Sequence, residues 1–415
     1  MFKISKAKYA FTFLMIVILS TFLIFINRNF QKTPAKAKIS QPKYIKKAKR
    51  EFKQYRYQKA DKILKGHKNK SAKSLKKQVH NQKGKLVTWN NPNQIPHLFF
   101  HSLIVNTQKA FASKQAEGYK DYMISIPQFK LILNQLHQRG YVLVNFKDLI
   151  RTNSQGKITF KSIKLPQGKK PIIISQDDVN YYTYMKKSGF ASNLMVNKKG
   201  QVKNEYINSG QKKIGNYDLL PIVDSFIKKH PDFSYKGAKG IIGETGYNGV
   251  LGYRSSKKVY GNKTKTKKAG QKAKKVANKI KADGWQFASH SWGHINFTES
   301  NPNDIKKDTN LWKKEVQPIV GKTNILLYPF GADIASFTNY EKNNPKYTDL
   351  HKKGFKIFDN VDATQTSWGQ LTSDYYRNAR INVDGIRINE DVAGQNKILD
   401  QFFNSKQVAQ AQNKK

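Results

Sequence analysis

The sequence predicts a mostly parallel α/β domain, most simply a barrel, between residues 86 and 400. Two observations lead to this fold class. Short apolar segments alternate with segments of helical period, and strands separated by helices of this length pair in parallel. A run of β-branched residues also ends in two acids, at the place where α/β barrels collect their chemistry. The expected strands cover residues 98–105, 141–146, 240–242, 285–288, 325–328 and 355–359, and the acidic strand starts near residue 172.

Helices are expected between these strands. Apolar residues recur with a helical period at 126–137 and at 219–229. The Lys-rich segment 257–281 is expected to begin as a loop and to continue as a helix that ends before Gly284. No repeat of solenoid length is evident.

Composition restricts the class of protein further. The chain has 415 residues, with 76 Lys and Arg against 27 Asp and Glu, and a formal net charge of +49. This excess indicates a partner or surroundings rich in negative charge, such as nucleic acid, anionic lipid or a phosphate-rich cell-wall polymer. Cysteine is absent, which excludes a disulfide scaffold and a Cys zinc site. Any metal must therefore be held by His, Asp or Glu.

The N-terminus predicts a membrane anchor at residues 1–27. After Lys3, Lys6 and Lys8, an apolar stretch at 9–26 is long enough to span a hydrocarbon core of about 30 Å as a helix. The preceding positive charges favour a cytoplasmic N-terminus. A cleaved signal peptide is the alternative, but the stretch exceeds the usual ~7–15 residues and no small-x-small site follows at once. We therefore expect a single-pass protein of the cell membrane whose bulk lies outside the cytoplasm.

Residues 28–85 are Lys-rich and nearly free of acids. A broken helical period at 44–64 fits a basic amphipathic helix, but the composition favours a solvated, self-repelling stalk or linker. The alternative is an electrostatic tether that binds phosphates of a wall polymer or of lipids. Both interpretations predict little core here. At the other end, residues 401–415 are polar and are expected to fray as a tail.

Two short motifs indicate a metal-dependent hydrolase. Asp177 and Asp178 end an apolar run, and burying two carboxylates is costly unless a cation compensates. His290 and His294 are spaced i and i+4, which places both imidazoles on one face of a helical turn. One carboxylate with two histidines leaves coordination positions open for water and substrate. Alone, the acid pair is typical of a cap or turn and the histidine pair of an exposed helix face, but their joint order favours a site.

These motifs resemble those of the polysaccharide deacetylases of the NodB-homology fold, a distorted (β/α) barrel that removes N-acetyl groups from N-acetylglucosamine-containing polymers. The resemblance covers residues 86–400. SQDDV takes the place of the family's T-F-D-D-G, and HSWGH matches H-[ST]-x-x-H in full. By position, the resemblance makes Asp177 the general base and Asp178, His290 and His294 the ligands of a divalent ion. We expect Zn²⁺, while Co²⁺, Ni²⁺ and Mn²⁺ stay open.

A third family motif, R-x-P-[YF], is only partly present. Leu327 stands where the family has the arginine that orients and tunes the base. Arg254 and Arg380 are the candidates to replace it, although a surface or substrate contact explains either one. The residues that the resemblance expects to line the site are Tyr328, Pro329 and Phe330, and a backbone N–H there would serve as an oxyanion donor.

The family's late Leu-x-His, which supplies the general acid, has no counterpart after His351. Segment 95–104 instead resembles the histidine-bearing strand of poly-N-acetylglucosamine deacetylases, whose barrel is circularly permuted. This resemblance makes His101 the candidate acid. A histidine satisfied within a strand is the alternative, and His97 is a weaker candidate.

Further polar residues resemble supporting groups of the site. Asp362, near Asp359, fits the second acid of the family's fourth motif, which tunes the catalytic histidine, although Ala363 replaces the tryptophan that should follow. Residues directly after the acid pair are expected to shape the substrate groove; they are Asn180, Tyr181 and Tyr182. Asp384, which precedes a glycine, is a turn candidate.

The resemblance implies a metal-dependent hydrolase that removes N-acetyl groups from cell-wall or extracellular polysaccharide. Three alternatives stay open: a catalytically degenerate, membrane-anchored wall-polymer-binding protein, an O-acetyl esterase with the same site, and a cationic surface protein for nucleic acid or anionic polymer. No nucleic-acid recognition motif is present, which disfavours the last one. The expected partners are an N-acetylated glycan and, through the basic stalk, an anionic wall polymer or membrane surface.

Overall fold

The computed structural model describes residues 42–336 and 338–413. The chain divides into two units, residues 1–46 and 47–415, and the second unit contains the whole barrel. The expected anchor at 9–26 lies outside the described residues. Within the described ranges, no helix is both long enough and apolar enough to cross a membrane.

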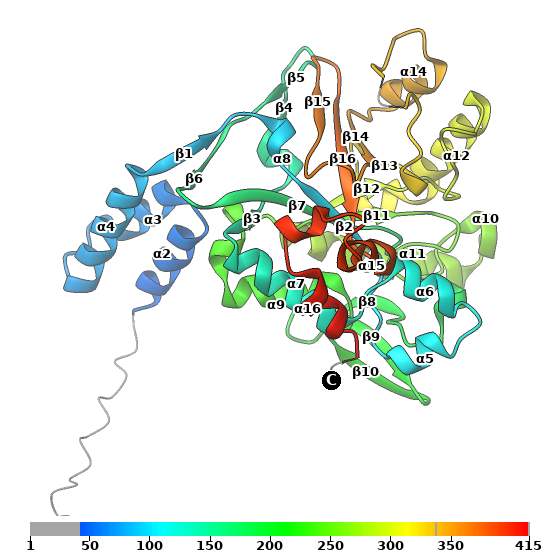
Figure 1. The fold of residues 1–415 in the computed structure, drawn as a ribbon, viewed down its shortest axis with the longest axis horizontal. Coiled ribbons are helices and arrows are strands. Elements are labelled where there is room, and N and C mark those ends of the chain that lie inside the picture. Colours follow the sequence, from blue (N-terminus) through cyan, green and yellow to red (C-terminus); the bar gives the residue numbers. More distant parts are fainter. Residues whose placement is uncertain (1–41, 337, 414–415) are drawn as a thin grey trace, which may run out of the picture. The chain divides into compact units, whose positions relative to one another are not determined.

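Seven parallel strands close into a barrel, in the middle of the ribbon in Figure 1. They are β2 (His97–Phe100), β7 (Lys170–Gln176), β11 (Ile241–Glu244), β12 (Gln286–Ser289), β13 (Ile325–Leu327), β14 (Ile357–Val361) and β16 (Tyr376–Asn382). The pairing of β11 with β7 closes the ring, in which the strands follow their chain order until β16 meets β2. The predicted α/β barrel is confirmed, while a circular permutation stays a prediction.

The barrel strands are buried on both faces, which explains their continuous apolar runs. In β7, Ile172 and Ile174 pack in the outer core beneath the helices, whereas Ile173 packs in an inner core. Side chains alternate along a strand, so Ser175 and Asp177 follow Ile173 toward the barrel interior. Both polar side chains are buried.

The remaining strands extend or flank the barrel. β3 (Tyr141–Leu143) pairs with β7, and β15 (Gly369–Leu371) pairs with β16. Three small antiparallel sheets are formed by β1 (Leu86–Trp89) with β6 (Ile163–Pro166), by β4 (Ile150–Thr152) with β5 (Ile158–Phe160), and by β8 (Asn193–Val196), β9 (Val202–Asn208) and β10 (Gln211–Gly215).

Helices connect the barrel strands. They are α5 (Thr107–Phe111), α6 (Ala116–Tyr122), α7 (Ile126–Gln138), α8 (Phe146–Leu149), α9 (Leu219–Lys229), α10 (Lys257–Tyr260), α11 (Thr264–Ala282), α12 (Pro302–Glu315), α13 (Gln317–Val320), α14 (Pro345–Lys352), α15 (Gly385–Val392) and α16 (Ser405–Gln410). α7 starts with a capping box of Ser125 and Gln128, and Asp218 caps α9. The predicted helices at 126–137 and 219–229 are therefore confirmed.

The expectation of little core before residue 86 is wrong for the described part of that stretch. It forms α2 (Lys43–Lys53), α3 (Tyr57–Leu64) and α4 (Lys70–Lys83). Tyr55, Tyr57, Ala60 and Val79 are buried in the same cluster as the inner apolar residues of the barrel. The helices are amphipathic, so lysines on their outer faces give the composition of a stalk while apolar residues face the core.

The predicted fraying of residues 401–415 is also wrong for most of that segment. Phe402 and Phe403 are fully buried in the outer core, and Val408 of α16 joins them. The Asn404 N–H donates to the Gln135 side chain on α7 at 2.7 Å. Three apolar side chains in a polar context are enough to dock this terminal helix.

Candidate active site

The candidate catalytic residues lie where barrel strands end. His101 follows β2, Asp177 and Asp178 follow β7, His290 follows β12, and Tyr328 follows β13. Because all these strands are parallel, their C-terminal ends meet at one rim of the barrel. Topology therefore gathers residues that are far apart in the sequence.

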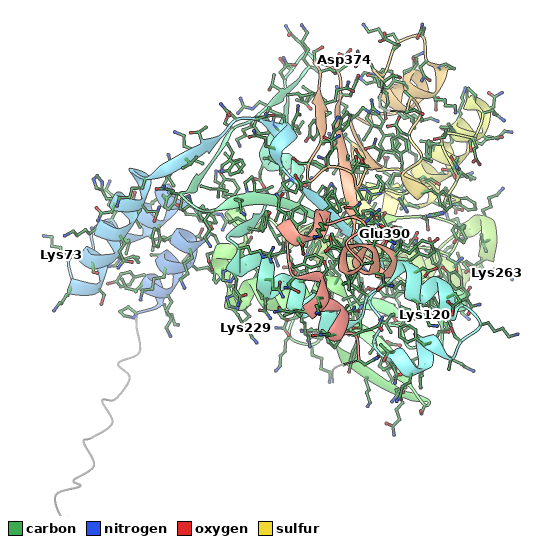
Figure 2. The ribbon with its side chains drawn as sticks, viewed as in Figure 1. Lys73, Lys120, Lys229, Lys263, Asp374 and Glu390 are labelled. Atoms are coloured by element: carbon green, nitrogen blue, oxygen red, sulfur yellow. The ribbon has the colours of Figure 1, made fainter. Side chains whose placement is uncertain are left out.

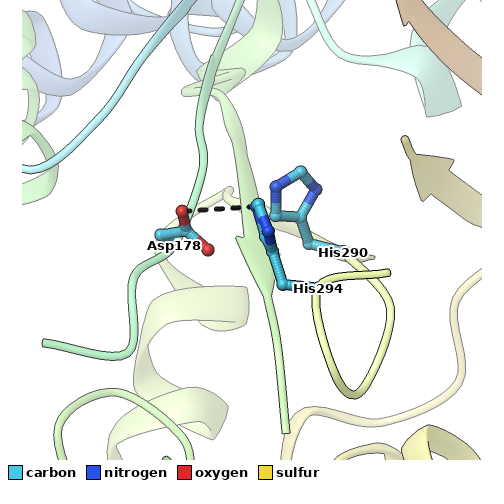
Figure 3. Close-up of side chains that lie close together, drawn as sticks. All are labelled: Asp178, His290 and His294. Carbon is cyan, nitrogen blue, oxygen red and sulfur yellow. Dashed lines mark ion pairs between the residues drawn. The ribbon is translucent and has the colours of Figure 1, made fainter. Parts of the chain in front are cut away.

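Asp178, His290 and His294 form the only group of metal-binding type found among the described residues. One donor atom from each lies within 4.8 Å of the others, and Asp178 Oδ2 is 3.7 Å from His294 Nε2. Figure 3 shows the carboxylate facing the imidazoles. This donor set fits a divalent ion with open coordination positions.

Two of these ligands are held by a hydrogen bond on the side away from the cluster. His290 Nδ1 donates to the backbone oxygen of Leu327 at 2.9 Å, which leaves Nε2 free to bind an ion. Burial lowers the pKa of His290 more than the nearby carboxylates raise it, so the ring is neutral. The Tyr182 hydroxyl donates to Asp178 Oδ1 at 2.5 Å, which leaves Oδ2 facing His294.

Several residues of the site adopt the left-handed backbone region. The φ angles are 58° at Asp178, 62° at Ser291, 55° at His294 and 60° at Phe330. For residues other than glycine this conformation costs on the order of 1 kcal/mol each, and the surrounding structure must enforce it. Such strain is concentrated at functional sites.

The two histidines do not lie on a helix, contrary to the expectation from their spacing. Residues 290–296 form an irregular loop after β12. The buried carboxylate of Asp308 on α12 holds this loop by accepting from Trp292 N–H at 2.7 Å and from Gly293 N–H at 2.6 Å. The loop, rather than helical geometry, brings the two ring centroids to 5.0 Å. No sequence motif pointed to Asp308.

Arg380 occupies the place of the missing motif arginine. Its Nη1 donates to both carboxylate oxygens of Asp177 at 2.8 Å, and both side chains are almost fully buried. Burial alone raises the pKa of Asp177, but the charge and the hydrogen bonds of the Arg380 guanidinium outweigh it and hold that pKa well below its usual range. Asp177 is therefore ionised, and its Oδ2 lies 3.7 Å from His290 Nε2.

Arg254 does not reach the base, so its expected supporting role is wrong. Its guanidinium donates to the backbone oxygens of Tyr181 and Asn248, the latter at 2.7 Å. These bonds tie the segment after β7 to the loop after β11. Of the two arginines considered from the sequence, only Arg380 contacts Asp177.

His101 lies at the rim, partly exposed, and its Nδ1 donates to the Tyr122 backbone oxygen at 3.0 Å. Nε2 is thus left for a substrate, and the ring is close enough to Asp177 for its charge to lower the pKa of that carboxyl. His97 instead lies in the barrel interior, between Asn378 at 2.9 Å and Ser175 at 2.8 Å. His97 is therefore a structural residue, and His101 keeps its predicted position beside the base.

Tyr328, Pro329 and Phe330 were expected to line the site after β13, but only Phe330 does so with its side chain. Tyr328 is fully buried, and its hydroxyl lies 2.9 Å from the Tyr340 hydroxyl. Pro329 is buried too. Phe330 is 70% exposed, and its ring meets His294 edge-on at 4.5 Å. The Phe330 N–H donates to no group in the described part of the chain, so it is available as an oxyanion donor.

The residues directly after the acids do not form a groove as expected. Asn180 is buried and joins the loop after β11 by donating to the Thr245 backbone oxygen at 2.8 Å. Tyr181 is buried and donates to Asp218 at 2.7 Å. Tyr182 is the functional one of the three, because it contacts Asp178.

Asp359 and Asp362, which resemble the motif whose acid tunes the catalytic histidine, have other roles. Asp362 accepts from the backbone and hydroxyl of Thr364, at 2.8 and 2.6 Å, and contacts no histidine within the described residues. Asp359 lies in the interior, 3.5 Å from His97. Asp384 caps α15 by accepting from Arg387 N–H at 2.9 Å, and it is close enough to His101 for that ring's charge to affect its pKa.

Aromatic rings surround the cluster. The Tyr182 ring is stacked between Tyr184, at 5.4 Å, and Tyr247, at 5.2 Å. Tyr184 is 51% exposed, so this stack runs from a metal-ligand contact to the surface. Together with Phe330 it gives the rim two exposed aromatic faces.

Comparison with known proteins identifies part of this rim. Residues 258–348 match the polysaccharide deacetylase family. The matched segment contains His290, His294 and the turn after β13, whereas Asp177 and Asp178 precede it. No curated protein matches the chain.

Two solved structures are similar to the chain at low identity. The deacetylase PplD of Streptococcus pyogenes in complex with acetate is 12% identical, with a TM-score of 0.40 over 74% of this chain and 99% of that chain. The chitin deacetylase of Colletotrichum lindemuthianum is 11% identical, with a TM-score of 0.23 over 45% of this chain and 77% of that chain. Both TM-scores are low.

Proposed function

We propose that this protein, whose residues 258–348 match the polysaccharide deacetylase family, is a metal-dependent deacetylase that removes N-acetyl groups from an N-acetylglucosamine-containing polymer. The observation that carries the proposal is the cluster of Asp178, His290 and His294 beside an ionised, buried Asp177. Burying ionisable groups costs free energy, so their convergence at one place indicates a catalytic or binding role.

The chain's own residues divide the reaction between them. Asp177 takes a proton from the attacking water, and Arg380 fixes the direction of its carboxylate. A carboxylate with a low pKa is a weak base, so the water must be made more acidic. Asp178, His290 and His294 would hold a divalent cation, most simply Zn²⁺, which would make the water more acidic and polarise the acetamide carbonyl. The Phe330 N–H donates to the developing oxyanion, and His101 Nε2 protonates the leaving amine.

Aromatic faces support a sugar polymer as the substrate. Tyr184 and Phe330 are exposed beside the cluster, and apolar faces of pyranose rings pack on such rings. We propose acetate and a polymer with free amines as products. The family's action on polysaccharides agrees with this choice.

We also propose that the enzyme acts outside the cytoplasm, held by residues 9–26 at the cell membrane. The support is the length of this apolar stretch and its preceding lysines. Membrane fractionation with protease protection tests this part independently of catalysis. A chain recovered wholly in the cytoplasm contradicts it.

The decisive experiment measures acetate release by the full-length chain from N-acetylglucosamine oligomers and from peptidoglycan. We expect release to stop with a chelator and to return with Zn²⁺. Asp178→Ala and His290→Ala should each lower kcat/KM by more than about 100-fold, because each removes a metal ligand. His80→Ala, an exposed histidine on α4, is the matched control and should leave the rate unchanged.

Other outcomes separate the alternatives. Release only from O-acetylated sugars contradicts the amide substrate and identifies an esterase. Absence of zinc binding in calorimetry contradicts the metal site and leaves a polymer-binding protein. Release that persists in both ligand variants contradicts the assignment of the cluster.

A further inference from the structure

A cavity opens at the end of the barrel opposite the candidate active site. Its volume is about 700 Å³, and its lining includes Gln286 at the start of β12, Asn324 just before β13 and Gly354 before β14. The N-terminal ends of parallel strands meet at one rim and the C-terminal ends at the other. This floor cavity and the Asp178 cluster therefore face opposite ends of the barrel.

Basic side chains dominate the floor cavity. Its lining contains no carboxylate and five lysines, namely Lys147, Lys281, Lys313, Lys322 and Lys353. Lys353 pairs with Asp349 at 2.7 Å, and Lys313 contacts the Gln317 side chain at 3.3 Å. The other three ammonium groups form no ion pair or hydrogen bond with any described residue. Unpaired like charges around one concave surface create a positive potential that attracts an anion.

A second basic cavity adjoins the first. It has a volume of about 860 Å³ and shares Lys147 and Lys281 with the floor cavity. Its three acids are already paired with basic residues of the same lining: Glu51 with Arg56, Asp224 with Lys239, and Asp283 with Lys279. These acids therefore do not offset the charge of the remaining lysines, and the two cavities form a continuous basic cleft.

Lysines occur over the rest of the molecule as well, so charge alone does not define a site. Figure 2 labels Lys73 on α4, Lys120 on α6, Lys229 at the end of α9 and Lys263 before α11. Lys120, for example, pairs with Glu117 at 2.8 Å. What distinguishes the cleft is that unpaired lysines converge on a concave surface.

We propose that this cleft binds a base-free phosphodiester polymer while the opposite rim acts on a glycan. Two adjoining cavities that share lysines fit successive phosphates along a chain. The lysines line two adjoining concave surfaces rather than one plane, so a flat bilayer does not contact them together. Nucleic acid is disfavoured because Trp285 and Phe287, the aromatic residues of the floor cavity, are 2% and 5% exposed and offer no stacking face.

Such binding would hold the enzyme on an anionic matrix without blocking its active site. The sequence located an anionic partner at the segment 28–85. The cleft instead places the polymer contact on the barrel itself, formed mainly by residues between 147 and 354. The proposal does not depend on the deacetylase reaction.

Titration calorimetry with the full-length chain and a short poly(glycerol phosphate) tests the proposal. We expect binding that weakens steeply with added salt. Lys147→Glu/Lys322→Glu reverses two unpaired lysines and should raise Kd by at least about tenfold. Lys73→Glu/Lys229→Glu changes net charge equally at exposed positions outside the cleft and should change Kd less than about twofold.

Acetate release from an N-acetylglucosamine oligomer should be equal in wild type and in both double variants, which shows that the variants fold. Equal weakening by the two double variants overturns the proposal, because net charge alone then explains binding. Tighter binding to anionic phospholipid vesicles or to single-stranded DNA of equal charge overturns the choice of polymer. A failure of acetate release in all three proteins contradicts the proposed reaction and leaves the binding result intact.

Discussion

The pair of Asp177 and Arg380 is hidden from water, so neither charge can be removed alone without leaving the other unpaired. We predict that Arg380→Met costs about 3–5 kcal/mol in the free energy of unfolding. The double variant Asp177→Asn/Arg380→Met should regain most of this loss, because no buried charge remains. Urea unfolding of wild type, Arg380→Met, Asp177→Asn and the double variant measures both effects. Additive losses in the double variant would mean that the pair is not coupled.

Tyr182 offers a test of how the metal ligands are held. Removing its hydroxyl in Tyr182→Phe frees Asp178 to rotate, and we predict that zinc affinity falls by about 10- to 100-fold. Tyr184→Phe is the matched control, since its hydroxyl forms no hydrogen bond within the described residues. Competition with a zinc chelator gives both affinities. Equal affinity in the two variants would contradict an orienting role for Tyr182.

The metal-binding candidates could be predicted from the sequence, because the motifs show which residue follows each strand. The residues that contact these candidates could not be predicted in this way. Whether Arg254 or Arg380 reaches Asp177 depends on the inward-facing register of β16, a strand that the sequence analysis did not assign. Asn180 and Tyr181 illustrate the same limit, because adjacency to an acid does not determine which way a side chain faces.

At the scale of elements, α12 organises the histidine loop through a single carboxylate. We predict that Asp308→Asn, which replaces one acceptor oxygen with an NH₂ donor facing a backbone N–H, lowers zinc affinity by about tenfold. Asp304→Asn, an exposed acid on the same helix, should have no effect on zinc binding. Chelator competition distinguishes the two. Unchanged affinity in Asp308→Asn would show that the loop holds its shape without α12.

A second ion pair connects α7 with the segment before β7. Asp232 accepts from His137 at 2.9 Å and from Lys169 at 3.2 Å. Burial alone raises the pKa of Asp232, but the hydrogen bond and charge of His137, with Lys169, hold it below its usual value. A depressed folded pKa adds stability above the unfolded pKa of about 3.9, and this stability is lost as pH falls through the folded pKa.

Asp232→Asn should therefore cost about 0.5–1 kcal/mol at about pH 6 and nothing at about pH 2. Urea unfolding of wild type and variant across this range measures the difference. Glu341→Gln, which changes an exposed acid outside any ion pair of the described residues, should show no such dependence. A cost for Asp232→Asn that persists at the lowest pH would mean that packing, rather than charge, is lost.

Long periodic elements were predictable, whereas short ones were not. α7 and α9 match the predicted ranges closely. Each has an N-terminal cap and apolar residues that recur over about three helical turns, a pattern that is typical of a helix and not of a strand. β8, β9 and β10 were missed. β9 buries alternate residues, but one of them is the polar Asn204, so its sequence does not show the apolar alternation of a strand, and β10 buries no residue.

At the scale of the whole molecule, α3 and α4 belong to the folded unit. We predict that a chain beginning at residue 86 is several kcal/mol less stable than one beginning at residue 42. Its loss of Tyr55, Tyr57 and Val79 exposes inner-core surface worth about 1.5–3 kcal/mol for each large side chain. Urea unfolding of both chains, with acetate release as a check of folding, measures the difference. Equal stability would restore the interpretation of this stretch as a stalk.

The meeting of the first and last barrel strands has a consequence for when the enzyme becomes competent. β2 carries His101 at its end and β16 carries Arg380, and the two strands pair only when the ring closes. Until β16 has joined the other strands, Asp177 lacks its ion-pair partner Arg380 and the barrel is open between β14 and β2. The site around Asp177 is therefore complete only once the strand that carries residue 380, the last strand of the barrel, has joined the ring.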